Sequence, residues 1–284
     1  MTAPAMEMKS ALLATLRYWR ECGIDRLSGE EFGWVAGRAL PTFSGSSSSL
    51  ASRNASRPIP PPPVGPVEPP VVAPEQRPVA RKSDRLLTSP VPVPERAEML
   101  RKWSQQILEC KQCGLSLTRQ RAVGGQGSGG APVVWIGDAP SEADESRGEP
   151  FSGELRAMVT GMVRALGLSW GEVYFSQVIR CRPPGDRTPR SAELQMCQEY
   201  WIRELETIRP RAILALGKVA VETLLGPVEQ LAKARKQVHS WRGVPVIAAY
   251  HPAYCLRAPL AKRAMWEDLL LMKTILEKAS GADS

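Results

Sequence analysis

Two groups of side chains in this sequence have the types and spacing that chemistry requires. The first lies in the segment GDAPSEADESRGEPFSG, residues 137–153, which contains five carboxylates, three glycines and Phe151. The segment follows the apolar run APVVWI, residues 131–136, and precedes a helical pattern, so we expect it where a strand ends and a helix begins. So many carboxylates at the mouth of a sheet are unexpected in a chain with excess positive charge, which makes this segment a candidate site.

The second group consists of four cysteines. The pair in CKQC, residues 110–113, lies in a loop-like segment, a third cysteine ends a predicted strand, and the fourth follows sixteen positions later within a predicted helix. Four thiolates can hold Zn(II) or a [4Fe–4S] cluster, and the ligand type alone does not decide between them. Buried thiols without a metal are the structural alternative. The set is Cys110, Cys113, Cys181 and Cys197, and neither Cys22 nor Cys255 is needed for it.

The composition favours an anionic partner, nucleic acid before membrane. Lys and Arg outnumber Asp and Glu by 37 to 29, which gives a net charge of +8. The sequence has no run of 18 apolar residues, and its N-terminus lacks the pattern of a secretory signal, so we expect a cytoplasmic protein. In that reducing compartment a metal or cluster is a better role for the cysteines than a disulfide framework.

The chain divides into three parts. Residues 1–40 contain Leu12, Leu16 and Trp19 at helical spacing, and this N-terminal helical anchor can pack on its own protein or fit another protein's groove. Residues 41–94 hold 14 of the 26 prolines and a serine run, which predicts a flexible linker. Residues 95–284 form the predicted folded domain.

This domain has an alternating α/β pattern. Strand-like runs are PVVWIG, VYFSQVIR, RAILALG and VPVIAAY, and helical patterns cover residues 154–166, 191–208, 218–225 and about 260–279. The alternation predicts a mostly parallel, four-stranded sheet with helices on both faces. Active sites of such sheets lie at the carboxyl ends of the strands. That edge should gather GDAPSEADESRGEPF, RCRPPGDRTP and HPAYCLR.

These motifs resemble a known family. CKQCGL, GDAPSEADESRGEPFSG, VYFSQVIRCRPPGDRTP, RPRAILALG and YHPAYCLR occur in the order and spacing of the family 4 uracil-DNA glycosylases, over about residues 105–280. The resemblance implies a uracil-DNA glycosylase-like three-layer α/β sandwich that carries a [4Fe–4S] cluster. It makes Cys110, Cys113, Cys181 and Cys197 the cluster ligands.

The resemblance also assigns the site residues. Phe151 would stack on an extruded base, and His251 would face a carbonyl oxygen of that base as a catalytic residue. Gln177 takes the place of the asparagine that reads uracil, and Arg257 is retained. The loop of Gly137, Asp138, Ala139, Pro140 and Ser141 would lie against the target nucleotide, with Asp138 as the catalytic carboxylate.

The catalytic motifs depart from the family's usual residues. The chain has Asp138 where the family has Glu and Ser141 where it has Gly. Gln177 is longer than the usual asparagine, and Ala253 replaces a serine. The cluster ligands are kept while positions that read uracil are altered, which is the pattern of a changed substrate or a retired active site.

Two functions from different classes follow. The first is a DNA glycosylase that removes uracil or a related damaged base from DNA that is single-stranded or has a flipped base. The second is a non-catalytic subunit of the DNA polymerase III clamp-loader assembly, because LRYWRECGIDRL resembles the docking peptide of its psi subunit and would bind clamp-loader proteins through residues 1–40. A DNA-binding protein with a structural cluster is the third possibility. In each case we expect phosphate contacts near the rim from arginines, among them Arg180, Arg182, Arg187, Arg190, Arg242 and Arg257.

Overall fold

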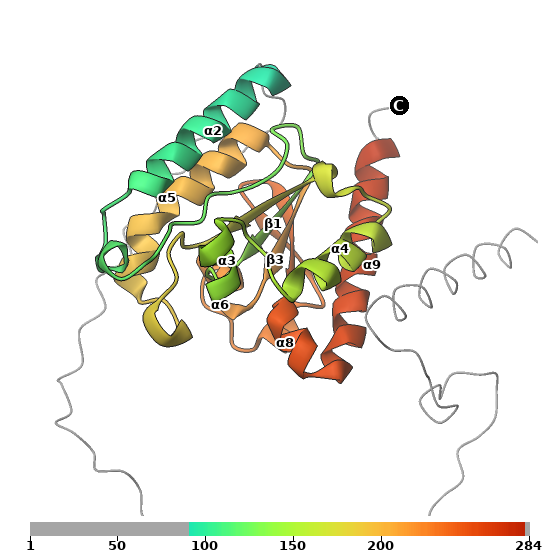
Figure 1. The fold of residues 1–284 in the computed structure, drawn as a ribbon. Helices are drawn as coiled ribbons and strands as arrows, with labels where there is room; N and C mark the ends of the chain where they lie inside the picture. The colour runs from blue at the N-terminus through green and yellow to red at the C-terminus, as the bar shows by residue number, and fades with distance from the viewer. Residues whose placement is uncertain (1–90, 282–284) are drawn as a thin grey trace, which may run out of the picture. The chain divides into compact units, whose positions relative to one another are not determined.

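The computed structural model describes residues 91–281. The predicted anchor, residues 1–40, and nearly all of the predicted linker, residues 41–94, lie outside the described residues. The described chain forms three layers, with one sheet between two layers of helices (Figure 1). This arrangement confirms the α/β class that the alternating pattern predicted.

The four predicted strands are parallel neighbours in the sheet. Each is short and almost entirely buried, because helices cover both faces of the sheet. Their register aligns Gly137 with Gln177 on one side and with Leu216 on the other. These strands are β1 (Val133–Gly137), β2 (Val173–Gln177), β3 (Ala212–Leu216) and β5 (Val244–Ala249).

A fifth strand corrects the predicted number of four. β4 (Val238–Trp241) pairs antiparallel with β5 at the edge, giving the order β2-β1-β3-β5-β4. Its first three residues are exposed or half-buried, so it lacks the continuous apolar run that revealed the others. Arg242 and Gly243 connect β4 to β5 with φ values of 47° and 84°, which suit a tight hairpin turn.

The predicted helices occupy the expected places, and the chain forms further helices that were not predicted, one of them, α2 (Val93–Glu109), 17 residues long. Helices were predicted at α4 (Leu155–Ala165), α5 (Ser191–Ile208), α6 (Lys218–Leu225) and α9 (Pro259–Gly281), and all four form. The chain also forms α2 (Val93–Glu109), α3 (Glu142–Arg147), α7 (Leu231–Ala234) and α8 (Pro252–Arg257), with 3-10 turns at Gly114–Leu117, Trp170–Glu172 and Pro184–Asp186. Within residues 91–281, no helix combines the length and apolar character that a membrane crossing requires.

Side chains alternate between the two faces of the sheet. Val133 and Trp135 join one core with α4, α8 and α9, and Val134 and Ile136 join another with α2, α5 and α6. The carboxyl ends of β1, β2, β3 and β5 therefore share one edge, between the two layers. Asp138, Gln177, Gly217 and His251 lie at or just after these strand ends.

The central position of β3 predicts a large loss of stability on truncation of Leu214. This side chain is fully buried, so Leu214→Ala should leave a cavity and lower the free energy of unfolding by about 2–5 kcal/mol in urea denaturation. Leu260→Ala is the matched control because Leu260 is 90% exposed, and its effect should stay within about 0.5 kcal/mol. Equal losses in both variants would contradict a core built around β3.

Candidate functional site

The ring of Phe151 lies against the carboxyl end of β1. A Cβ at position 137 would come within 2.9 Å of Phe151 Cζ, closer than packed atoms allow, so the position of the Phe151 ring depends on glycine there. The same Cβ would only touch His251 Nε2, at 3.5 Å. Phe151 has a φ of 55°, a left-handed conformation that is uncommon for a bulky residue. Its ring packs edge-on against Phe175, with 5.9 Å between centroids, and lies 6.1 Å from the His251 ring in a stacked orientation. The loop is therefore held in a constrained shape that keeps an aromatic ring at the strand ends.

His251 follows β5 and caps α8. Its Nδ1 accepts a hydrogen bond from the Ala253 backbone N–H at 3.3 Å. Burial lowers the pKa of the ring to about 4, with a further contribution from the charge of Arg257. The imidazole is therefore neutral at pH 7, and because Nδ1 is an acceptor, the ring proton is on Nε2. That Nε2 is buried and has no hydrogen-bond partner among the described residues.

Gln177 ends β2 beside Gly137. It is 1% exposed, and alternation along β2 puts its side chain on the same face as Phe175, the face that Phe151 covers. Its Nε2 donates to Asp144 Oδ2 at 3.1 Å. Its Oε1 is buried and meets no donor within the described part of the chain. Buried polar atoms without partners are costly, so such atoms point to a missing ligand or water.

These three side chains together form a site with a specific capacity. The neutral imidazole offers a buried donor, the Gln177 amide offers a buried acceptor, and Phe151 supplies a flat apolar surface. A planar heterocycle with a carbonyl oxygen and a ring N–H would satisfy both polar atoms and stack on the phenyl ring. The strand ends therefore form a candidate base-binding site.

A buried carboxylate holds the loop around this site. Asp144 Oδ1 accepts the Ser152 N–H at 2.6 Å, and Oδ2 accepts the N–H of Ser141 at 3.0 Å together with the Gln177 amide. Ser141 is the N-cap of α3, and its Oγ accepts the Asp144 N–H in return. Ser141, predicted to lie against a nucleotide, is thus part of a capping box, and this explains a serine at a position where the family has glycine.

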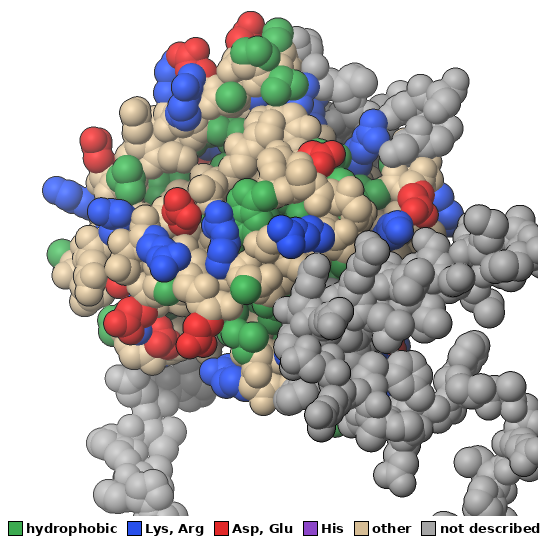
Figure 2. All heavy atoms as spheres, turned by 45° about the vertical axis from the view of Figure 1, so that its right-hand side comes forward, with side chains coloured by type: hydrophobic (Ala, Val, Ile, Leu, Met, Phe, Trp, Pro, Cys, Tyr) green, Lys and Arg blue, Asp and Glu red, His purple; other side chains and the backbone are tan. Residues whose placement is uncertain are grey.

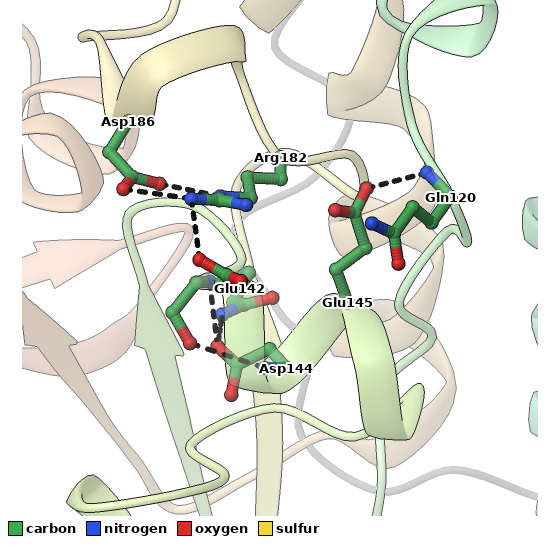
Figure 3. Close-up of polar contacts among 8 residues, drawn as sticks. Gln120, Glu142, Asp144, Glu145, Arg182 and Asp186 are labelled. Atoms are coloured by element: carbon green, nitrogen blue, oxygen red, sulfur yellow. Dashed lines mark hydrogen bonds and ion pairs between the residues drawn. The ribbon is translucent and has the colours of Figure 1, made fainter.

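The other acids of residues 137–153 also have partners in the protein. Glu142 forms an ion pair with Arg182, which also pairs with Asp186 (Figure 3). Glu145 Oε1 accepts the Gln120 N–H at 2.9 Å, and Glu149 Oε2 lies 3.5 Å from Arg156 Nη1. The carboxylates therefore shape the loop between β1 and α4, which answers why so many gather at this edge of the sheet.

Asp138 lies over the N-terminus of α6. Its Oδ1 accepts the Ala220 N–H at 2.7 Å, and a Cβ at Gly217 would come within 2.3 Å of Oδ2. Burial of the carboxyl group raises its pKa to about 7, although bonds from the Ala220 and Val219 N–H groups act in the opposite direction. Asp138 is thus placed at the expected edge, with one oxygen occupied by the helix, and its catalytic role stays a prediction.

The remaining predicted contacts lie around this edge. Pro140 is buried, and Ala139 packs beside the cysteines. Arg257 is exposed at the end of α8, close enough to His251 to affect its pKa. The structure gives these positions no hydrogen bond to His251 Nε2 or to Gln177 Oε1.

Two of the expected phosphate-binding arginines are elsewhere. Arg180 is 1% exposed, and its Nη2 donates to the buried Glu204 at 2.6 Å, so its predicted phosphate contact is wrong. Arg242 pairs with Glu206 in the β4–β5 turn, which lies at the amino end of β5 and so at the opposite edge of the sheet. On the face drawn in Figure 2, Lys and Arg side chains are distributed with acidic ones between them.

The four predicted metal ligands gather beside the site. Cys110 follows α2 and Cys113 precedes the 3-10 turn Gly114–Leu117, while Cys181 lies four residues after β2 and Cys197 lies in α5. All four are thiols packed in one cluster with Ile107, Leu115 and Ile179. Cys255 belongs to the other core, where its Sγ contacts the Ala261 carbonyl oxygen at 3.7 Å. The structure therefore groups the four cysteines apart from Cys255, as the sequence did, and their role as metal ligands stays a prediction.

Positive charge lies next to these thiols. Arg119 Nη1 donates to Cys181 Sγ at 3.0 Å, and the same guanidinium donates to the Cys110 carbonyl oxygen at 2.7 Å. Burial raises the pKa of Cys197 to about 12 and also raises that of Cys181. In the part of the chain that the structure describes, no three His, Cys, Asp or Glu side chains are arranged to hold a single metal ion.

Sequence reasoning missed Asp144 and Arg119. The Ser-x-x-Asp pattern at residues 141–144 predicts a helix start, and it could have identified Asp144 as a capping residue. Its bond to Gln177 connects residues 33 positions apart, so no local pattern reveals it. The same holds for Arg119, which is 62 positions from Cys181.

The pKa of Asp138 predicts how stability changes with pH. Its value of about 7 exceeds the 3.8 of an ordinary aspartate, so between these values the folded protein holds a proton that the unfolded chain releases. The contribution of Asp138 to stability should therefore be greatest below pH ~4 and fall as pH rises to ~7, with a limiting slope of ~1.4 kcal/mol per pH unit. Asp138→Asn removes this titration, so in urea unfolding the variant should gain stability relative to wild type across that window. If the difference in stability between Asp138→Asn and wild type did not vary with pH in this window, Asp138 would already be ionised in the folded protein.

Comparisons with known proteins agree with this geometry. Residues 125–270 match the family model of the uracil DNA glycosylase superfamily. The chain is 34% identical over 163 residues to the type-4 uracil-DNA glycosylase of Archaeoglobus fulgidus, a match covering 55% of this chain and 82% of that protein. It is 31% identical over 182 residues to the type-4 enzyme of Saccharolobus solfataricus, covering 61% and 84%. For the type-4 enzyme of Thermotoga maritima the identity is 32% over 187 residues, covering 64% and 97%. With its parallel sheet, its paired rings at the strand ends and these matches, the chain belongs to the uracil DNA glycosylase superfamily.

Proposed function

We propose that this protein is a DNA glycosylase that removes uracil from DNA by hydrolysing the N-glycosidic bond, the first step of base excision repair. The observation that carries this proposal is the presence of two buried polar atoms without hydrogen-bond partners in the described part of the chain, beside the Phe151 ring. One is a donor, His251 Nε2–H, and the other is an acceptor, Gln177 Oε1. Uracil has a carbonyl oxygen and a ring N–H on adjacent atoms, so one base can satisfy both. The type-4 relatives bear the name of this activity.

His251 would stabilise the leaving base. Cleavage of the bond between the sugar and uracil leaves negative charge on the base, and water adds to the sugar carbon. A neutral imidazole with its proton on Nε2 donates a hydrogen bond to that charge. Because its pKa is about 4, the imidazole stays neutral through the physiological pH range.

The base has to be extruded from the stack before it reaches the site. Phe151 is 1% exposed, so a flipped base contacts the ring only after adjoining side chains or the loop have moved. Single-stranded DNA, or a duplex with a weakly paired uracil, reduces the cost of extrusion and should be the better substrate. When its carboxyl group is ionised, Asp138 would offset the positive charge that develops on the sugar.

We also propose that the four gathered cysteines hold a [4Fe–4S] cluster. They come from three segments, pack with Ile107, Leu115 and Ile179, and lie beside the Arg119 guanidinium, which offsets the charge of thiolate ligands. Four cysteine thiolates are the ligand set that such a cluster takes. When bound, the cluster would cross-link α2, α5 and the segment after β2.

The assembly-subunit alternative gains no support from the relatives named above. Docking on clamp-loader proteins through residues 1–40 stays a prediction, because it lies outside the described residues. A cytoplasmic location likewise stays a prediction.

Loss of the histidine donor predicts slower base release. His251→Ala should reduce the single-turnover rate of uracil release from single-stranded DNA by at least ~10²-fold, measured as abasic sites. His239→Ala is the matched control: the other histidine of the chain bonds the Ala234 carbonyl oxygen from edge strand β4, and its loss should leave the rate unchanged. Uracil release that is insensitive to His251→Ala would refute the role of this residue.

The cluster proposal predicts colour and iron content. Protein purified without oxygen should be brown and contain about four irons per chain. Cys181→Ser should lose the iron and lower the thermal midpoint, because the free energy of binding contributes to folding. Cys255→Ser should keep the iron, since this equally buried thiol belongs to the other core. Stoichiometric zinc without iron in the same preparation would exclude the iron cluster.

A further inference from the structure

We propose that Asp144 is a positioning residue that fixes which end of the Gln177 amide faces the base, so that the site selects a base with a ring N–H over one with a bare ring nitrogen. The inference rests on the proposed uracil excision. It adds Asp144 to the residues that were predicted for the site, and it states which atom of the Gln177 amide faces the base.

The contacts of Asp144 leave the amide one orientation. Asp144 is 1% exposed, and both of its oxygens accept backbone N–H groups, from Ser152 at Oδ1 and from Ser141 at Oδ2. A carboxylate oxygen that accepts a backbone N–H does so through a lone pair, so its second partner must also be a donor. Gln177 must therefore turn its NH₂ group toward Oδ2, from which the nitrogen lies 3.1 Å away.

The opposite end of the amide is then fixed as an acceptor. Gln177 Oε1 is buried and without a donor in the described region, on the sheet face that carries Phe151. The N3–H of uracil can donate to this oxygen, whereas the bare N3 of cytosine would bring two acceptors together. A site with an unpaired buried polar atom rejects a base that cannot pair with it.

Asp144 also holds the loop that carries Phe151, through the N–H of the next residue, Ser152. A purely structural role would therefore slow release of every base equally. A positioning role through Gln177 should alter the preference between bases, and this difference separates the two roles.

The test uses Asp144→Asn in the full-length protein. Asparagine has one oxygen where aspartate has two, and its NH₂ can donate to Gln177 Oε1, which allows the Gln177 amide to turn. We expect the uracil release rate on single-stranded DNA to fall about 10- to 100-fold and the rate ratio of uracil to cytosine to fall by a similar factor. Glu145→Gln is the matched control: it removes a buried charge from the same helix and keeps an oxygen for the Gln120 N–H. If the ratio of the uracil release rate to the cytosine release rate were unchanged in Asp144→Asn, the proposal would be overturned.

A second measurement decides the matter even if the variant does not fold. In wild-type protein, the Gln177 side-chain NH₂ and the Ser141 backbone N–H both donate to Oδ2 of Asp144, so NMR should show nuclear Overhauser contacts between their protons. These side-chain protons should also exchange slowly with water. Absent contacts together with fast exchange would refute the proposed orientation. Wild-type protein that releases no uracil would refute the proposed function, and the NMR result would still decide the orientation of the amide.

Discussion

The Phe151 ring can lie at the end of β1 because residue 137 has no side chain. A Cβ there would come within 2.9 Å of that ring, so the ring occupies space that any other residue would fill, and His251 Nε2 lies at contact distance, 3.5 Å, from the same point. The parallel register then places Gln177 directly beside Gly137. Close approach at one glycine therefore brings together a ring from the β1–α4 loop, an imidazole from the end of β5 and an amide from β2.

The cysteine cluster and the base site are connected through the chain that leaves β2. Only three residues separate Gln177 from Cys181, and between them Arg180 is anchored by the buried Glu204, which also accepts from Ser176. Removing either member of such a buried ion pair leaves an uncompensated charge, which costs about 3–5 kcal/mol. This pair therefore holds the segment in place, and a cross-link at Cys181 would fix both the cysteine and the amide that reads the base.

The departures from the family's usual motif have physical explanations in this chain. Ser141 replaces a glycine and caps α3, since its hydroxyl accepts the Asp144 N–H. Asp138 replaces a glutamate, and its short side chain reaches the Ala220 N–H at the start of α6. These substitutions build a loop held by its own hydrogen bonds. They do not remove the donor, acceptor and ring that a base requires, which favours a working site over a retired one.

Much of the fold could be predicted from the sequence because its signals are local. Strands β1, β3 and β5 are continuous or nearly continuous apolar runs, and α4, α5, α6 and α9 have apolar residues at helical spacing; edge strand β4 was missed because its outward side chains interrupt that signal. The cysteine spacing likewise grouped Cys110, Cys113, Cys181 and Cys197 apart from Cys255, as their packing does, and the motifs predicted Phe151, Gln177 and His251 as site residues. The sequence alone assigned Arg180 to phosphate and left Asp144 without a role. Only the tertiary structure decided these, because the partner of Arg180 is 24 residues away and that of the Asp144 carboxylate is 33 residues away. A residue's type and neighbours specify which bonds its side chain can make, whereas packing of distant segments determines which bonds are made.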